Sequence, residues 1–244
     1  MPYWSELTHG NFAKAASETE VVVMMTGALE AHGKHLPLGT DSMLPEFLGQ
    51  KLAEKTKALV LPVIPFGESW NFDKYEGTIS IKSDVLVDYY RSVMKAVFKH
   101  GFRYIIALNG HGGNDSILRQ AAKKATRKDE RVVIIVNWWR DLAKSARTLV
   151  EESPGGHGAE DETSEVMHVR PDLVDMSRAE AHRVETKFTI ISGAYRGELL
   201  PSAMYGDPTK ASEEKGRLIM EQAEEELVEL VHRLEKGQLP LGSD

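Results

Sequence analysis

Short apolar runs alternate along this chain with longer stretches of helical periodicity. The runs that are apolar on both faces cover residues 21–26, 59–61, 104–108 and 132–136. Such runs predict buried strands of a parallel sheet covered by helices on both sides. The pattern between and after them predicts helices over 43–56, 84–100, 114–127 and 140–151. We expect Asp84 and Asn114 to be the N-caps of the second and third helices.

This alternation favours an α/β fold, namely a three-layer α/β/α sandwich with a mostly parallel central sheet. The length of 244 residues fits a single domain over 1–244. A last helix is predicted from Pro208 to Lys236, with Asp207 as its cap and Pro208 at the first helical position. The segment 178–206 is less regular, and it predicts a strand and a loop that serve as a lid or a subunit contact.

The composition narrows the classes of function. A net charge of −7 speaks against nucleic acid as a partner. The absence of cysteine excludes disulfides, thiolate metal sites and cysteine nucleophiles. The first residues lack a basic start and an apolar core, and no apolar run approaches the roughly 20 residues of a membrane span. We therefore expect a cytoplasmic protein without a membrane partner.

The first polar cluster, residues 27–41, directly follows the first predicted strand. Glu30 and His32 are two residues apart, so extended backbone projects both side chains to the same side. Asp41 precedes the next helix and can return to meet them. Two carboxylates and an imidazole suit a divalent metal, although exposed loop residues are the alternative interpretation. His35 is either an orienter of a ligand or a packed loop histidine.

The second cluster, Asn109 to Asn114, follows the strand predicted over 104–108. Glycines flank His111 and permit a sharp turn and a close approach. A nucleotide phosphate loop is the rival interpretation, but the third glycine of that motif would fall at Asp115. The cluster therefore favours His111 as a metal ligand at a strand end, where α/β sheets bind ligands.

The third cluster, residues 155–166, opens a predicted helix near Ala159. Helical spacing places Glu162 on the apolar face with Val166. An inward carboxylate needs a partner, and no Lys or Arg lies on that face, which favours a metal. Glu160 either has a role beside the site or stabilises the helix N-terminus.

These three clusters resemble, in order, the signature motifs of the creatininase (creatinine amidohydrolase) family. The start of the last helix, residues 206–216, is similar as well, so the resemblance spans 27–216. Within this family, the chain resembles a subgroup with a Gly-Gly central motif, to which formylamino-pyrimidine ribotide deformylases belong. The resemblance implies an α/β/α fold, a homo-oligomer that is usually a hexamer, and two divalent metal ions per chain, which we expect to be Zn, Mn or Fe.

The resemblance also implies a division of the ligands between two metals. One metal would take Glu30, Asp41 and His111, and the other would take His32, the bridging Asp41 and a further glutamate. In creatininase that glutamate lies two residues after the central histidine, where this chain has Gly113. Relatives with the Gly-Gly motif use the glutamate of the third motif instead, which is Glu162 here.

By the same resemblance His157 is a catalytic residue that transfers a proton between water and the leaving group. Creatininase has a tryptophan shortly before this histidine, whereas residues 153–156 here are Ser-Pro-Gly-Gly, which speaks against creatinine as the substrate. Trp70, Tyr75, Trp138 and Trp139 are interpreted as pocket walls or core residues.

The sequence thus predicts a metal-dependent amidohydrolase with catalytic residues His157 and Glu162. We expect a metal-bound hydroxide to cleave an amide or formamide C–N bond of a small polar molecule. One alternative is hydrolysis of a C–C bond in a cyclic diketone of the keto-inositol type at the same site. Another alternative is a non-catalytic protein with a structural metal site, although such sites need no spare acid–base group.

Overall fold

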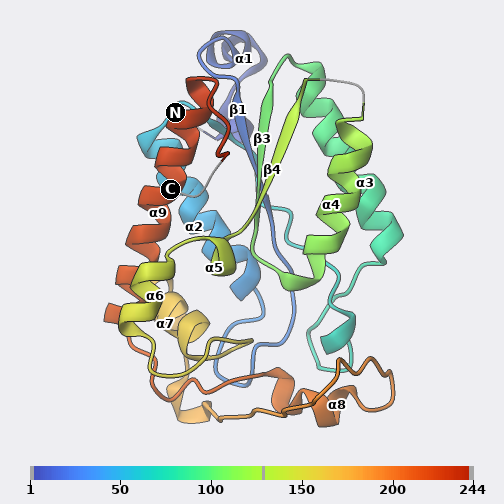
Figure 1. The fold of residues 1–244 in the computed structure, drawn as a ribbon, viewed down its shortest axis with the longest axis vertical. Coiled ribbons are helices and arrows are strands. Elements are labelled where there is room, and N and C mark those ends of the chain that lie inside the picture. The colour runs from blue at the N-terminus through green and yellow to red at the C-terminus, as the bar shows by residue number, and fades with distance from the viewer. Residues whose placement is uncertain (1–2, 128–129, 242–244) are drawn as a thin grey trace.

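The structure, a computed structural model, describes residues 3–127 and 130–241. Its centre is a four-stranded parallel sheet with the strand order β2-β1-β3-β4 (Figure 1). The strands are β1 (Val21–Thr26), β2 (Leu59–Val60), β3 (Tyr104–Asn109) and β4 (Val132–Asn137). The four predicted strands and the α/β/α architecture are thereby confirmed, and the three pairings between these strands are all parallel.

Helices cover both faces of this sheet. One face packs against α3 (Ser83–Lys99) and α4 (Asp115–Ala125) (Figure 1). The other face packs against α2 (Thr40–Lys55) and α9 (Glu213–Glu235), and α7 (Glu160–Val169) lies on α9. The short helix α1 (His9–Ala16) adds Ala15 to the core on the α3 side.

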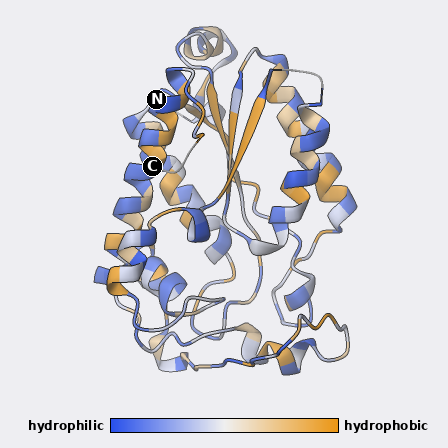
Figure 2. Cartoon of the chain, in the orientation of Figure 1, coloured by the Kyte–Doolittle hydropathy of each residue, from blue (hydrophilic) through white to orange (hydrophobic). Residues whose placement is uncertain are grey.

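Alternation along the strands feeds two separate cores. Val21, Val23 and Met25 point toward α2 and α9, whereas Val22 and Met24 point toward α3 and α4. Because both faces are covered, β1 and β3 are buried along their whole length. Figure 2 shows the result as strands coloured hydrophobic between helices that carry both colours.

The helix expected from Pro208 begins later, at Glu213. The Oδ1 atom of Asp207 accepts hydrogen bonds from the N–H and the hydroxyl of Thr209, which makes a turn instead of a helix cap. The cap is Ser212, whose side chain accepts the N–H of Lys215. The prediction was wrong because an Asx turn and a helix cap use the same residue types.

Two other predictions about helix ends also need correction. The helix expected over 140–151 is divided into α5 (Trp138–Asp141) and α6 (Lys144–Val150), because Ala143 adopts a left-handed conformation with φ of 54°. Asp84 is not an N-cap, since α3 begins at Ser83 after Lys82. Asn114 does occupy the N-cap position of α4, but its side chain bonds elsewhere.

The segment 178–206 contains no strand, only isolated bridges of His182 with Gly206 and of His157 with Tyr205. Its regular parts are short turns and the one-turn helix α8 (Arg196–Leu199). Figure 1 shows this segment crossing the end of the molecule that also holds α7. Across the described parts of the chain, no helix is long and apolar enough to cross a membrane.

Candidate metal centre

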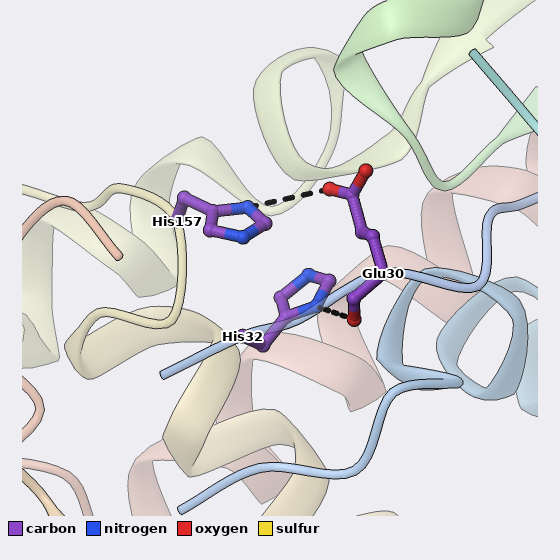
Figure 3. Close-up of side chains that lie close together, drawn as sticks. All are labelled: Glu30, His32 and His157. Carbon is purple, nitrogen blue, oxygen red and sulfur yellow. Dashed lines mark hydrogen bonds and ion pairs between the residues drawn. The ribbon is translucent and has the colours of Figure 1, made fainter. Parts of the chain in front are cut away.

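Glu30 and His32 lie in the loop that follows β1. Both are fully buried, which excludes the interpretation as exposed loop residues. The loop is held in place by backbone bonds from the N–H of Glu30 to the carbonyl of Leu38 and from the N–H of Ile79 to the carbonyl of Leu29. The side chains of Glu30 and His32 therefore project from a fixed backbone, and both lie close to His157 (Figure 3).

Asp41 lies in the first turn of α2, between two imidazoles. Its Oδ1 is 3.0 Å from Nε2 of His32, and its Oδ2 is 2.8 Å from Nδ1 of His111. The approach of α2 depends on Gly110, because a Cβ atom there would lie 2.0 Å from the carbonyl oxygen of Asp41. Asp41 thus joins two histidines that come from different strand ends.

His111 follows β3 on the glycine loop, as expected. The side chain of Asn114 ties this loop to the first one, since its amide donates to the carbonyl of Gly27 and its oxygen accepts the N–H of Glu68. Asn114 was predicted as a helix cap, but the structure uses its side chain to fix the distance between two loops that hold candidate ligands.

The two neighbouring glutamates of α7 point in different directions. Glu162 Oε2 lies 3.8 Å from Nε2 of His32 and accepts the N–H of Gly158. Glu160 instead pairs with Lys215 at 2.6 Å and accepts backbone N–H groups of Glu152 and Ser153. The structure therefore brings Glu162 to the site and uses Glu160 to hold the loop before His157.

Three histidines of the site share one pattern of hydrogen bonding. In each, one ring nitrogen faces a backbone carbonyl: His32 that of Glu30 at 3.1 Å, His111 that of Glu68 at 2.6 Å, and His157 that of Ala31 at 2.8 Å. A carbonyl oxygen only accepts, so that nitrogen carries the proton. The other nitrogen has no backbone partner, and in each case it faces a carboxylate.

The ring nitrogens and the carboxylates of the described residues form three groups of candidate metal ligands, and within each group the ligand atoms lie within 4.8 Å of one another. Two groups share Asp41: one adds Glu30 and His111 to it, and the other adds His32 and Glu162. These two groups contain the same residues as the two ligand sets that the resemblance implied. The third group combines Glu30 and His32 with His157.

The donor set fits a divalent metal. Both carboxylate oxygens of Glu30 and the Oδ2 of Asp41 are buried without a hydrogen bond, although histidine nitrogens lie close to them. Burying an unpaired carboxylate is costly. Oxygen and imidazole ligands around such a place are typical of zinc, manganese or iron sites.

The electrostatics of the cluster favour cations. Burial opposes protonation of His32, but Asp41 and Glu162 outweigh it and raise the pKa of His32 to about 10. Burial likewise opposes protonation of His111, yet Glu30 and Asp41 raise its pKa well above the usual value. The carboxylates therefore create a strongly negative field, which attracts protons or a metal cation to the same nitrogens.

His157 lies beside this cluster. Its Nδ1 is 3.7 Å from Oε1 of Glu30, and its ring centre is 4.0 Å from that of His32 (Figure 3). Burial and the neighbouring His32 lower the pKa of His157 to about 4. The imidazole is therefore neutral, and Nδ1 is the ring nitrogen that can accept a proton.

His35 is buried and does not touch the ligand atoms. Its Nε2 lies 3.0 Å from the hydroxyl of Thr163, the residue after Glu162. Burial lowers its pKa to about 4, with His32 adding to the effect. Of the two interpretations left open, the packed histidine is the better description, with Thr163 linking it to α7.

Glu30, Asp41, His111 and Glu162 line a cavity of about 530 Å³. This volume is typical of a small-molecule site. Residues outside the three motifs supply much of its wall, among them Glu68, Ser69, Asn71, Phe72, Trp139 and Arg140. Of the four aromatics considered from the sequence, only Trp139 lines it, whereas Trp138 belongs to the core.

Two contributors to the site left no signal in the sequence. Glu68 acts through its backbone carbonyl, and any residue type has one. Phe72 stacks on His157 with ring centres 4.0 Å apart and an angle of 11° between the planes. Hydrophobic pattern does not distinguish such an aromatic from an ordinary core residue.

Comparison with known proteins shows what this chain is similar to. The profile of the creatininase family, described as creatinine amidohydrolase, matches residues 5–231. A creatinine amidohydrolase of Pseudomonas putida is 29% identical over 238 residues, covering 88% of this chain and 90% of its own. A mycofactocin precursor peptide peptidase of Mycobacterium ulcerans is 27% identical, covering 97% and 94%.

A third relative, a 3-dehydro-scyllo-inosose hydrolase of Thermotoga maritima, is 26% identical and covers 70% of this chain and 57% of its own. Among solved structures, one described as creatininase with Mn superposes with a TM-score of 0.87. It covers 96% of this chain and 98% of its own at 23% identity, which shows the shared fold.

Proposed function

Because this chain belongs to the creatininase family of hydrolases, we propose that it uses two metal ions to cleave an amide or formamide C–N bond of a small polar substrate. Membership makes it a creatininase-like, metal-dependent hydrolase and favours an enzyme over a non-catalytic protein. The proposal concerns the number of metals and the bond that is cleaved. One observation carries it: two groups of ligand atoms share Asp41.

Glu30, Asp41 and His111 would hold one ion, and His32, Asp41 and Glu162 would hold the other. A divalent ion bound in this way polarises a carbonyl oxygen and lowers the pKa of water toward about 7. Glu162 would supply the carboxylate that creatininase has at the position of Gly113. A side chain at 113 is not accommodated here, because its Cβ atom would lie 2.1 Å from the carbonyl oxygen of Glu68.

His157 would move the proton. Its Nε2 donates to the carbonyl of Ala31, so Nδ1 is the atom able to accept a proton on the side of Glu30. His157 also lines the cavity and can pass the proton to a leaving nitrogen. The walls of the cavity would hold the substrate and exclude most of the water.

The cavity favours a small polar substrate other than creatinine. Ser69, Asn71 and Arg140 offer hydrogen-bonding groups on its wall. Residues 155 and 156 are glycines with no room for a ring, since a Cβ atom at Gly156 would lie 1.9 Å from the carbonyl oxygen of Tyr205. A cytoplasmic location and a hexameric assembly stay predictions from the sequence.

The Thermotoga relative supports a second candidate, hydrolysis of a C–C bond in a cyclic diketone. The ligand set would serve it equally, but the leaving group would be an enolate instead of an amine. The two candidates therefore differ in products and not in site residues.

The test is turnover by protein stripped with chelator and reloaded with Mn²⁺ or Zn²⁺. Small formamides, primary amides, short peptides, creatinine and a cyclic 1,3-diketone serve as the panel, with products followed by proton NMR. We expect metal-dependent release of formate or amine from a formamide or amide. Cleavage of the diketone alone would replace the proposal by the second candidate, and turnover unaffected by stripping would refute metal use.

A further inference from the structure

The His157 ring is held between two flat groups. The His32 ring lies on one side at 4.0 Å, tilted by 31°, and the Phe72 ring lies on the other at 4.0 Å, with an angle of 11° between planes. Stacking of aromatic rings at this separation is favourable. Turning the imidazole about its side-chain bonds would break this stacking on both sides.

Turning would move both ring nitrogens away from their present partners. In the observed orientation Nε2 faces the carbonyl of Ala31 at 2.8 Å and Nδ1 faces Glu30 Oε1 at 3.7 Å. A rotated ring would place carbon atoms at one or both of these positions. The proton on Nε2 would then lose its acceptor, and no lone pair would point toward Glu30.

Phe72 is well placed to keep this orientation. It is only 6% exposed and packs in a small apolar cluster with Ala31 and Ala203. Ala31 is the residue whose carbonyl accepts from His157. The ring that stacks on His157 and the carbonyl that accepts its hydrogen bond thus belong to the same apolar cluster. A displacement of Phe72 would disturb both contacts.

The turn that carries Phe72 is tied to the segment around α8. The guanidinium of Arg196 donates to the carbonyl of Trp70, pairs with Asp73 and lies over the Trp70 ring. The hydroxyl of Tyr75 donates to the carbonyl of Leu200. These contacts bracket Phe72 along the chain, so the ring is fixed by more than its own packing.

We propose that Phe72 is a positioning residue for proton transfer: it holds His157 with Nε2–H on the Ala31 carbonyl and Nδ1 toward the reacting groups. The inference rests on the proposed function for its catalytic consequence. Phe72 itself transfers no proton. Its effect is expected in the rate of the chemical step and in the tautomer of His157.

The test compares Phe72→Leu with Phe72→Tyr and Phe102→Leu in the Zn²⁺-loaded enzyme. Leucine keeps apolar volume but removes the flat face, whereas tyrosine keeps that face. Phe102 is a matched control, since it is 2% exposed and packs against Trp4 in the core outside the site. Metal content and melting temperature are measured on every variant.

We expect Phe72→Leu to lower kcat by about 10- to 100-fold with KM nearly unchanged, because a general acid–base group is only displaced. Phe72→Tyr should regain most of kcat, and Phe102→Leu should leave it unchanged. A rise in KM at unchanged kcat would make Phe72 a wall for the substrate, and an equal effect of Phe102→Leu would make it a core residue. Either outcome overturns the proposal.

A second measurement needs no substrate. Long-range proton–nitrogen NMR of protein labelled in its nine histidines reports which ring nitrogen carries the proton, and His157→Gln identifies the signals of His157. We expect the Nε2–H tautomer in the wild type and mixed tautomers in Phe72→Leu. An unchanged tautomer of His157 in Phe72→Leu would refute the positioning role of Phe72. If the wild type cleaves no substrate, the proposed function fails while this measurement still decides what Phe72 does.

Discussion

Helix α7 carries buried and half-buried carboxylates, and these carboxylates have different partners. On one side Glu162 faces His32 and Asp41, and within the described chain no Lys or Arg pairs with it. On the opposite side Glu160 pairs with Lys215, and farther along the helix Glu165 lies 2.8 Å from a guanidinium nitrogen of Arg147. One ten-residue helix thus presents a carboxylate that faces imidazoles and carboxylates that lie beside protein cations.

The difference shows how a structural carboxylate is distinguished from a candidate ligand. Glu160 has a protein cation, Lys215, as its partner, so its burial needs no further group. Glu162, Glu30 and Asp41 have imidazole nitrogens as neighbours instead. Carboxylates and imidazole lone pairs that converge without a fixed cation are typical of a metal site.

Asp41→Ala should have the largest effect on metal binding and activity, because Asp41 belongs to both of the proposed ligand groups. We expect both metals to be lost and activity to fall by more than about a thousandfold, or roughly 4 kcal/mol of transition-state stabilisation. Metal content by elemental analysis and turnover are measured together. Two metals retained at wild-type affinity would exclude Asp41 as the shared ligand.

Glu162→Gln and Glu160→Gln compare the two sides directly. Glu162→Gln should lose one metal and lower activity by about a hundred- to a thousandfold with little change in melting temperature. Glu160→Gln should keep both metals but lower the free energy of unfolding by about 1–3 kcal/mol, since Lys215 and Ser153 lose a charged partner. The opposite distribution of effects would assign the metal to Glu160.

Gly113→Ala tests whether the backbone carbonyl of Glu68 orients the candidate ligand His111. A Cβ atom there would lie 2.1 Å from the carbonyl oxygen of Glu68 and 2.5 Å from Nε2 of His111. Because that carbonyl orients His111, we expect metal affinity to fall by about 10- to 100-fold. Gly112→Ala is the control, since its Cβ atom meets nothing within 4 Å. Equal effects of both variants would show that loop flexibility matters instead.

Glu165→Gln should alter only the pH dependence of stability. Burial raises the pKa of Glu165 to about 8, with Arg147 opposing the effect. The folded state then holds a proton that the unfolded chain releases near its ordinary value of 4.5, so stability decreases as pH rises from about 4.5 to 8. The slope is at most about 1.4 kcal/mol per pH unit.

An amide side chain at position 165 cannot ionise, so the Glu165→Gln variant should lose this slope while keeping its metals. Urea unfolding between pH 5 and 8 measures it. A wild-type slope that is preserved in the variant would show that Glu165 stays ionised beside Arg147.

The sheet could be predicted because burial on both faces leaves uninterrupted apolar runs in the sequence. The ends of helices were harder to predict from the sequence. Asp207 was expected to cap a helix, but its side chain forms a turn, and Ser212 caps α9 instead. The break at Ala143 follows from a left-handed backbone that alanine rarely adopts. No local pattern predicts it.

Residues brought together at the site could be proposed from the sequence, because strand ends and helical spacing orient Glu30, His32 and Glu162. The contributions to the site that the sequence did not predict come from a backbone carbonyl and from the face of an aromatic ring. Glu68 contributes a carbonyl, and Phe72 contributes a stacking surface. Their roles depend on long-range packing, which leaves no signature in residue type.

Anomalous diffraction from crystals of protein purified without chelator and loaded with Mn²⁺ or Zn²⁺ tests the central claim most directly. Two peaks are predicted, one among Glu30, Asp41 and His111 and the other among His32, Asp41 and Glu162. The absence of a peak at these residues, or a peak that Asp41 does not contact, would contradict the account.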